Sequence, residues 1–377
     1  MHLGTFDTFH RPDHLDNFPL LLGNLREQAV ASESLGYHSI WLGEHHFNHI
    51  GIDPMPNPLM LGADLATRTK RLRIGQACLC LPFWHPVRVA EDVALLDQLS
   101  GGRVEVGIGK GTRPREGLIF HEDADPRRKP EQNALFAEVL EVMIKAWTQE
   151  FFSHDGPNFT FPPPGTPWTH PMIPPDERWF SDGEVTKICM LPKCVQEPHP
   201  PIWMVSDSDH SIDFAASRGI NGIIWQPPVP MLREKFIRYR DKRSEAEARE
   251  LRLGEGMALM KAVYVAPTME EARADTEAGI LHLFNWVHPK TRGLEIFRRP
   301  DEADVPWRDI TWEFLMERDN LLIGDPDSVA EQVATLRDEL NLESLFTYTN
   351  VPWLENSKIL RSLELMANEV MPKVEGR

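Results

Sequence analysis

The chain has 377 residues, of which 41% are hydrophobic and 26% are charged, a composition typical of a folded globular protein. Its formal net charge of −17 argues against a nucleic-acid-binding or membrane-binding surface, since both need a concentrated basic patch. No apolar run approaches the roughly 18 residues of a membrane span, and the four cysteines have neither zinc nor disulfide spacing, so we expect a cytoplasmic protein with reduced thiols.

Strand-like and helical patterns alternate along most of the chain. The predicted strands are residues 2–7, 40–43, 72–79, 104–108, 202–205, 222–225, 258–265 and 344–349. The clearest helical patterns between them are residues 18–35, 59–67, 87–99 and 131–147. Eight strands that are each followed by a helical segment predict an α/β protein, a (β/α)8 TIM barrel formed as a single domain by residues 1–377.

Two stretches interrupt this alternation. Residues 152–200 are rich in proline, and residues 282–322 interleave tryptophans with charged side chains. Proline removes a backbone donor, so we expect long loop excursions there rather than regular sheet. In barrels of this kind, long insertions lie at the C-terminal face and cover the active site. We therefore expect both excursions at that face.

The end of the second predicted strand carries an unusual group of side chains. An apolar run at residues 40–42 reaches Gly43 and is followed by Glu44, His45 and His46. Imidazole titrates near neutral pH, and an adjacent carboxylate can fix its tautomer, so the group suits proton transfer. A polar loop is the plain alternative, but catalytic groups of barrels project from the carboxyl ends of strands.

Two further strand ends carry groups that suit a phosphate. They are Gly109, Lys110 and Thr112 after the fourth strand, and Asp207, Ser208 and Ser211 after the fifth. The first set offers close backbone approach, a cation and a hydroxyl. The second runs into a helix, whose first N–H groups can bind an anion. Either set alone could be a turn or a helix cap, and their convergence with strand two favours a site.

Aromatic residues near the strand ends indicate what kind of molecule would be bound. Phe6, Phe83 and Trp225 lie at or close to predicted strand ends. Pockets for small molecules are lined mainly by apolar and aromatic side chains, so these residues suggest a largely apolar substrate. The alternative is that they pack the core, which aromatic residues commonly do.

Several motifs resemble those of the bacterial luciferase family of flavin-dependent monooxygenases, and the resemblance covers almost the whole chain. It rests on residues 41–47 (WLGEHHF), 85–103, 324–333, 357–365 and 369–372. The family implies a (β/α)8 barrel that uses O2 and reduced FMN, supplied by a separate reductase that oxidises NADH or NADPH. It also implies a homodimer formed through the helices that follow strands two and three.

The resemblance also implies roles for individual residues. His45 resembles the catalytic histidine beside the flavin, and Glu44 resembles the carboxylate under its ring system. The link between Ala77 and Cys78 matches a peptide that is often cis in the family and packs against the flavin ring. The residues that match phosphate, ribityl or ring contacts are Lys110, Thr112, Asp207, Ser208 and Ser211.

The chain departs from the family pattern at two of these positions. Gly109 stands where luciferase has a reactive cysteine, which leaves space for a bulkier substrate, so we place Gly109 in the substrate pocket with Phe6, Phe83 and Trp225. Lys110 stands where luciferase has arginine, which removes bidentate recognition of a phosphate. The proline-rich excursion is also longer than the family pattern.

The first functional hypothesis is a two-component monooxygenase that inserts one oxygen atom into a small organic substrate, as a hydroxylation or a Baeyer–Villiger oxidation, with His45 as general acid/base. A deazaflavin-dependent hydride-transfer enzyme and a non-catalytic flavin-binding relative are the alternatives on the same barrel. A metal-dependent hydrolase would use residues such as His45, His46, His49 and His85. Adjacent histidines on a strand point to opposite faces, so we expect no metal.

Overall fold

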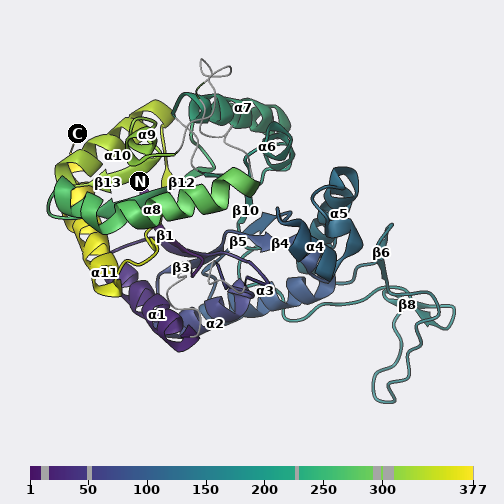
Figure 1. The fold of residues 1–377 in the computed structure, drawn as a ribbon. Helices are drawn as coiled ribbons and strands as arrows, with labels where there is room; N and C mark the ends of the chain where they lie inside the picture. The colour runs from purple at the N-terminus through teal and green to yellow at the C-terminus, as the bar shows by residue number, and fades with distance from the viewer. Residues whose placement is uncertain (10–16, 49–52, 226–228, 292–298, 300–309, 377) are drawn as a thin grey trace. The chain divides into compact units, whose positions relative to one another are not determined.

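The computed structural model describes residues 1–9, 17–48, 53–225, 229–291, 299 and 310–376. The chain divides into two compact units, whose elements are labelled in Figure 1. The first unit comprises Met1–Leu79, Glu105–Ile108 and Pro201–Arg377, and the second comprises Cys80–Val104 and Gly109–Pro200.

The first unit contains a closed barrel of parallel strands. In order around the barrel they are β1 (His2–Asp7), β2 (Ser39–Leu42), β3 (Arg73–Gln76), β5 (Val104–Gly109), β10 (Ile202–Val205), β11 (Asn221–Trp225), β12 (Met257–Val265) and β14 (Ser344–Tyr348). Pairing of β10 with β5, which sets Ile202 opposite Val106, closes the ring. A further strand, β13 (Leu321–Gly324), pairs with β12. The predicted (β/α)8 TIM barrel is confirmed.

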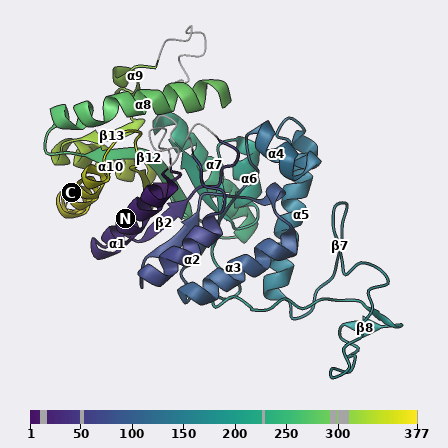
Figure 2. The same ribbon diagram turned by 60° about the horizontal axis from the view of Figure 1, so that its bottom comes forward.

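Helices follow the strands of this unit. They are α1 (Phe18–Ser34), α2 (Pro58–Arg68), α6 (Asp209–Ala216), α7 (Val229–Glu247), α8 (Met269–Thr291), α9 (Trp312–Met316), α10 (Pro326–Leu340), α11 (Asn356–Leu365) and α12 (Met371–Glu375), with a π-helical turn at Met366–Val370 before α12. Figure 2 shows α1 beside α2, and both helices contact β2. Several helices begin at an asparagine or aspartate cap followed by proline, as α2 does at Asn57 and α10 does at Asp325.

The barrel interior is filled by aromatic side chains. The rings of Trp41 and Phe346 stack with their centroids 4.4 Å apart, and Trp203 meets Trp41 edge-on at 5.7 Å. Gly75 makes room for this packing, because a Cβ atom there would lie only 2.3 Å from the Trp41 ring. The interior is therefore a packed core, as in other barrels of this class.

Polar and charged groups gather at the amino ends of the strands. Inside the barrel, Arg73 forms an ion pair with Glu105, which also accepts a hydrogen bond of 2.7 Å from the Trp203 indole. Burial raises the pKa of the Glu105 carboxyl above its usual value, against the opposing effect of Arg73. A buried charge of this kind is tolerated only when it is paired and hydrogen-bonded.

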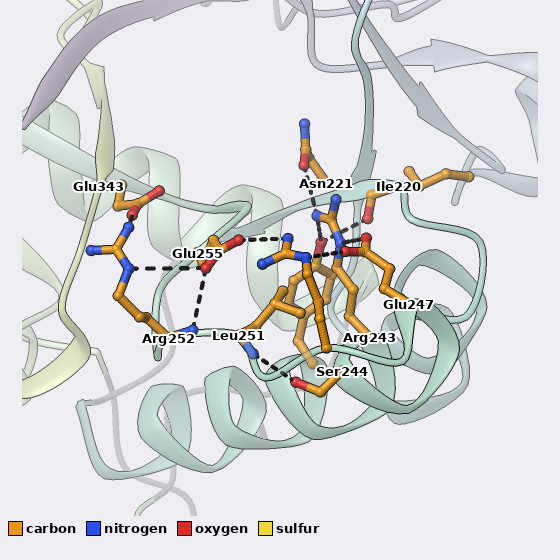
Figure 3. A network of polar contacts seen from close by, with 11 residues as sticks. Ile220, Asn221, Arg243, Ser244, Glu247, Leu251, Arg252, Glu255 and Glu343 are labelled. Atoms are coloured by element: carbon orange, nitrogen blue, oxygen red, sulfur yellow. Dashed lines mark hydrogen bonds and ion pairs between the residues drawn. The ribbon is translucent and has the colours of Figure 1, made fainter.

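A second polar network joins the amino ends of β11, β12 and β14, as Figure 3 shows. Arg243 on α7 binds Glu247 at 2.6 Å and the side-chain oxygen of Asn221 at 2.9 Å. Arg252 binds Glu343, just before β14, at 2.8 Å. These contacts connect the loops opposite the carboxyl ends of the strands, where groups of a barrel usually serve stability rather than catalysis.

The second unit is mostly helical up to Thr148 and mostly irregular after it. Its elements are the 3-10 turns Leu81–Phe83 and Glu122–Ala124, the helices α3 (Pro86–Ser100), α4 (Pro114–Phe120) and α5 (Lys129–Thr148), and two hairpins formed by β6 (His154–Asp155) with β7 (Thr160–Phe161) and β8 (Phe180–Ser181) with β9 (Glu184–Val185). In Figures 1 and 2 the β8–β9 hairpin lies away from α3 and α5.

The first predicted excursion, residues 152–200, is irregular apart from these hairpins. It follows α5 and precedes β10, so it is a helix-to-strand connection, which differs from the strand-to-helix position expected from the sequence. Its last residues are held by helix ends of the same unit. The Lys193 ammonium binds the Ala146 carbonyl at 2.8 Å, and the Gln196 amide binds Asp97 at 2.8 Å.

The sequence did not predict two other features of the chain. The predicted strand 72–79 is divided into β3 and β4 (Leu79–Cys80), with residues 77–78 between them. The second predicted excursion, 282–322, begins inside α8 and ends inside β13, while residues 292–298 and 300–309 lie outside the described part of the chain. Leu283 and Phe284 are buried on α8, which explains why the helix continues past residue 282.

Candidate functional site

The carboxyl ends of β1, β2 and β14 lie side by side in the first unit. The register sets Asp7 opposite Leu42 and Phe6 opposite Tyr348. The residues that follow β2, including Glu44 and His45, therefore emerge next to the end of β1. This is the position where a parallel barrel carries its catalytic groups.

Glu44 and His46 form a buried pair after β2. An oxygen of the Glu44 carboxylate lies 2.9 Å from Nε2 of His46, and Glu44 is only 3% exposed. This contact fixes the position of the His46 imidazole next to the Glu44 carboxylate. His45 lies between these residues in sequence but has a different neighbour, which agrees with the expectation that His45 and His46 point to opposite sides.

The neighbour of His45 is Asp53, which the sequence analysis missed. Nε2 of His45 lies 3.8 Å from Oδ2 of Asp53, and the other oxygen of Asp53 accepts a hydrogen bond of 2.8 Å from the Thr8 hydroxyl. A histidine beside a carboxylate that is itself anchored is an arrangement suited to proton transfer. No periodicity links the three residues, because they are separated in the sequence and meet only in the folded chain.

Three predicted ring-contact and substrate residues also belong to this unit. Phe6 is buried in an apolar cluster of the core, and Ala77 and Trp225 pack against the same cluster. The peptide bond between Ala77 and Cys78 is cis, as the resemblance implied. Phe6, Ala77 and Trp225 thus share one apolar environment with the barrel core, so the core-packing interpretation also holds for Phe6.

The predicted anion site after β10 is built around the start of α6. Ser208 and Ser211 form a reciprocal capping box, and their hydroxyl oxygens lie 2.8 Å apart. Ser208 is exposed and Ser211 is buried. The cap engages the N–H groups and the hydroxyls of both serines, while the other N–H groups of the first turn suit a phosphate.

A lysine that the sequence analysis missed approaches this loop. Lys235, on α7, donates a hydrogen bond of 2.5 Å to the carbonyl oxygen of Asp207. Its ammonium therefore lies beside the predicted phosphate-binding residues of the first unit. Lys235 follows the next strand of the barrel, and no spacing in the sequence indicates that it returns to the β10 loop.

The remaining predicted residues belong to the second unit. Lys110 follows Gly109 at the end of β5, and its ammonium donates a hydrogen bond of 2.9 Å to Asn133 on α5. Burial, with a smaller contribution from Lys129, lowers the pKa of Lys110 below its usual value. Thr112, two residues later, is exposed. Both side chains lie on a loop that α5 supports.

Phe83 belongs to an aromatic pair of the second unit. Its ring stacks on Phe120 of α4 with centroids 5.2 Å apart. Gly111, which has a left-handed φ of 75°, brings the backbone of the Lys110 loop against this ring, since a Cβ atom there would lie 2.5 Å from Phe83. The predicted substrate residue Phe83 and the predicted phosphate loop are therefore neighbours.

The two units together contain every predicted site residue. The first carries Phe6, Glu44, His45, Ala77, Cys78, Asp207, Ser208, Ser211 and Trp225, and the second carries Phe83, Gly109, Lys110 and Thr112. Among the described residues, no group of histidine, cysteine, aspartate and glutamate side chains could hold a metal ion, and His49 lies outside them. None of the described helices combines the length and apolar character needed to cross a membrane.

Comparison with known proteins identifies the family. The family model described as luciferase-like monooxygenase matches residues 1–341. The chain is 28% identical to the oxygenase component of the flavin-dependent trigonelline monooxygenase of Acinetobacter baylyi, over 93% of this chain and 89% of the relative. It is 26% identical to limonene 1,2-monooxygenase of Rhodococcus erythropolis, over 98% and 85% of the two chains.

A solved structure agrees with this result at the level of the fold. The oxygenating constituent of 3,6-diketocamphane monooxygenase from Pseudomonas putida, in complex with FMN, superposes with a TM-score of 0.78 and 23% identity, over 99% of this chain and 98% of that one. Barrel architecture, strand-end histidines and the nearly full-length family match agree with one another. The chain belongs to the luciferase-like monooxygenase family.

Proposed function

We propose that this protein is the oxygenase component of a two-component monooxygenase, which uses reduced FMN and O2 to insert one oxygen atom into a small, largely apolar organic substrate. The observation that carries the proposal is the match to the family over residues 1–341, together with His45 at the strand end where barrel catalysis occurs. The relatives described above are named as flavin-dependent or oxygen-inserting enzymes. The reaction would be a hydroxylation or a Baeyer–Villiger oxidation.

The residues of the candidate site suit FMN, the cofactor that such a reaction requires. Ser208 and Ser211 with the first-turn N–H groups of α6, together with Asp207, Lys110 and Thr112, would hold the phosphate and ribityl chain. The segment at Ala77 and Cys78 would contact the ring system together with Glu44. When bound, reduced FMN supplies the electron pair that activates O2.

His45 would transfer protons during the reaction. One oxygen atom of O2 enters the substrate and the other leaves as water, so a proton must be delivered to the departing oxygen. An imidazole beside a buried carboxylate can hold that proton and release it in the site. Phe6, Phe83, Gly109 and Trp225 would provide the apolar walls that exclude water and bind the substrate.

Two partners follow from this proposal. One is a flavin reductase that oxidises NADH or NADPH, in keeping with the name "oxygenase component" of the Acinetobacter relative. The other is a second copy of the chain, bound through α2 and α3. Each of these helices exposes apolar side chains, with Met60 on α2 being 72% exposed and Leu99 on α3 being 56% exposed.

The proposal is tested by product analysis under 18O2. The protein is supplied with a reductase, NADH, FMN and a panel of terpenoid, ketone, aldehyde and aromatic substrates, and products are identified by mass spectrometry. Incorporation of one labelled oxygen atom that depends on FMN supports the proposal. Substrate oxidation without oxygen, with a deazaflavin in place of FMN, would support the hydride-transfer alternative. Flavin binding without any substrate-dependent oxygen consumption would indicate a non-catalytic relative.

A further inference from the structure

Asp53 is a buried carboxylate held beside His45 by several independent contacts. The Asp53 residue is 5% exposed, and its Oδ2 lies 3.8 Å from Nε2 of His45, a distance of an ion pair rather than of a hydrogen bond. Its Oδ1 accepts a hydrogen bond of 2.8 Å from the Thr8 hydroxyl, which fixes the carboxylate from the end of β1. The two oxygens therefore have two different neighbours.

The backbone holds the same two residues together. The His45 N–H group donates to the Met55 carbonyl at 2.9 Å, and the Met55 N–H group donates to the Asp53 carbonyl at 2.9 Å. Met55 itself is fully buried, which anchors this short segment. The separation between His45 and Asp53 is thus set by main-chain hydrogen bonds as well as by the side chains.

Tyr348 is a second neighbour on which the charge of Asp53 bears. Burial raises the pKa of the Tyr348 phenol well above its usual value, and the negative charge of Asp53 adds to that effect. Tyr348 lies at the end of β14, opposite Phe6 of β1. A buried carboxylate is stabilised by a neighbouring N–H donor, and Nε2 of His45 lies at ion-pair distance from Asp53.

We propose that Asp53 is a positioning residue for His45. Its carboxylate favours the imidazole form that carries a proton on Nε2, so that Nδ1 is the nitrogen that accepts and releases the proton during turnover. The Thr8 hydroxyl keeps the carboxylate in place for this purpose. This inference rests on the proposed role of His45 in proton transfer. Asp53 itself touches neither substrate nor flavin in this assignment.

A purely structural role is the competing explanation. In that case Asp53 would only secure the loop after β2 to Thr8, and replacing it would change stability without changing the state of the imidazole. The two explanations differ in one measurable property, namely which ring nitrogen of His45 carries the proton. Nitrogen chemical shifts report this directly in the protein without flavin or substrate.

The test uses protein labelled with 15N-histidine, with the His45 signals assigned by their loss in His45→Gln. In wild type the form protonated on Nε2 should predominate when the ring is neutral. In Asp53→Asn that predominance should be lost, while the melting curve remains cooperative. An unchanged His45 spectrum in folded Asp53→Asn would overturn the inference, whatever the enzyme catalyses.

Thr8 provides a matched pair of variants should Asp53→Asn not fold. Thr8→Val removes the hydroxyl that binds Oδ1 but keeps the shape of the side chain, whereas Thr8→Ser keeps the hydroxyl. We expect Thr8→Val to shift the His45 signals toward those of a mixture of the two neutral imidazole forms. Thr8→Ser should resemble wild type. Equal spectra for the two variants would contradict the role of Thr8 as anchor and, with it, the inference.

Activity separates failure of this inference from failure of the proposed function. Asp53→Asn should reduce coupled product formation on the order of 10–100-fold, the range known for carboxylates that orient metal-bound histidines, with the missing turnover released as hydrogen peroxide. A changed spectrum with unchanged coupling would show that the contact exists but that His45 has no role in proton transfer. Loss of coupling with an unchanged spectrum would assign Asp53 another role and overturn the inference.

Discussion

An oxygen of Glu44 lies 2.9 Å from Nε2 of His46, whereas the intervening His45 has its Nε2 3.8 Å from Asp53. Two consecutive imidazoles after one strand therefore have separate carboxylate neighbours. Glu44 and His46 form a buried pair, and His45 is part of a smaller cluster with Asp53 and Thr8. This division suggests different roles for the two histidines, which substitution can test.

His46 should contribute mainly to stability. His46→Ala withdraws a hydrogen-bond partner from the buried Glu44 carboxylate, and we expect the free energy of unfolding to fall by about 1–3 kcal/mol. Urea denaturation monitored by circular dichroism measures this change. His45→Ala is the matched control and should cost less, since the His45 side chain is 27% exposed against 10% for His46. Equal losses for the two variants would contradict the division of roles.

His45 should control coupling of oxygen to substrate. His45→Ala should retain the fold and most of the affinity for FMN, but product formation should fall by about 10²–10⁴-fold, the range for loss of a general acid/base. Oxygen consumption should continue and be recovered as hydrogen peroxide. The measurement compares product with peroxide per NADH oxidised. Wild-type coupling in His45→Ala, or loss of coupling in folded His46→Ala alone, would refute the assignment.

Much of the barrel could be predicted from the sequence because its strands are short apolar runs bounded by glycine, proline or charge. Strands β1 and β10 have the predicted bounds. The division of β3 from β4 and the short strand β13 were missed. The break between β3 and β4 leaves no trace in the pattern of apolar residues. Strand β13 has four residues, which are too few to give a clear strand pattern.

The candidate site could be predicted only where it lies directly at a strand end. Glu44, His45 and Lys110 were proposed from the sequence because they follow predicted strands. Asp53 and Lys235 were missed because each reaches the site through tertiary folding, from a loop and from a helix respectively. Chain position indicates which face a residue occupies, but not which side chains from other elements meet there.

The amino end of the barrel should give the protein a dependence of stability on pH. Partial desolvation of the imidazole lowers the pKa of His38 from 6.5 to about 4, although the residue as a whole is exposed, and the neighbouring His2, whose ring stacks 4.2 Å away, adds to the effect. The unfolded chain therefore binds this proton more readily than the folded chain, and the stability present above pH 6.5 should be lost as the pH falls toward about 4. Denaturant titrations between these values measure the loss.

His38→Gln tests the assignment of that dependence. The variant should show a flatter profile of unfolding free energy against pH in this window, whereas His170→Gln, in the proline-rich excursion, should keep the wild-type profile. A wild-type profile in His38→Gln would assign the dependence to other groups.

Lys110 should contribute to binding of the flavin phosphate. Lys110→Ala removes the cation at the end of β5, and we expect FMN binding to weaken by roughly 1.5–3 kcal/mol, the usual range for charged hydrogen bonds. Fluorescence titration with FMN and with riboflavin separates the phosphate from the ring, because riboflavin lacks the phosphate and its affinity should not change. Asn133→Ala is the matched control, since it removes the partner that holds the Lys110 ammonium at 2.9 Å but leaves the cation in place, and it should lose less affinity. Equal losses for FMN and riboflavin in Lys110→Ala would show that the lysine supports the loop rather than the phosphate, and unchanged FMN affinity would remove Lys110 from the site.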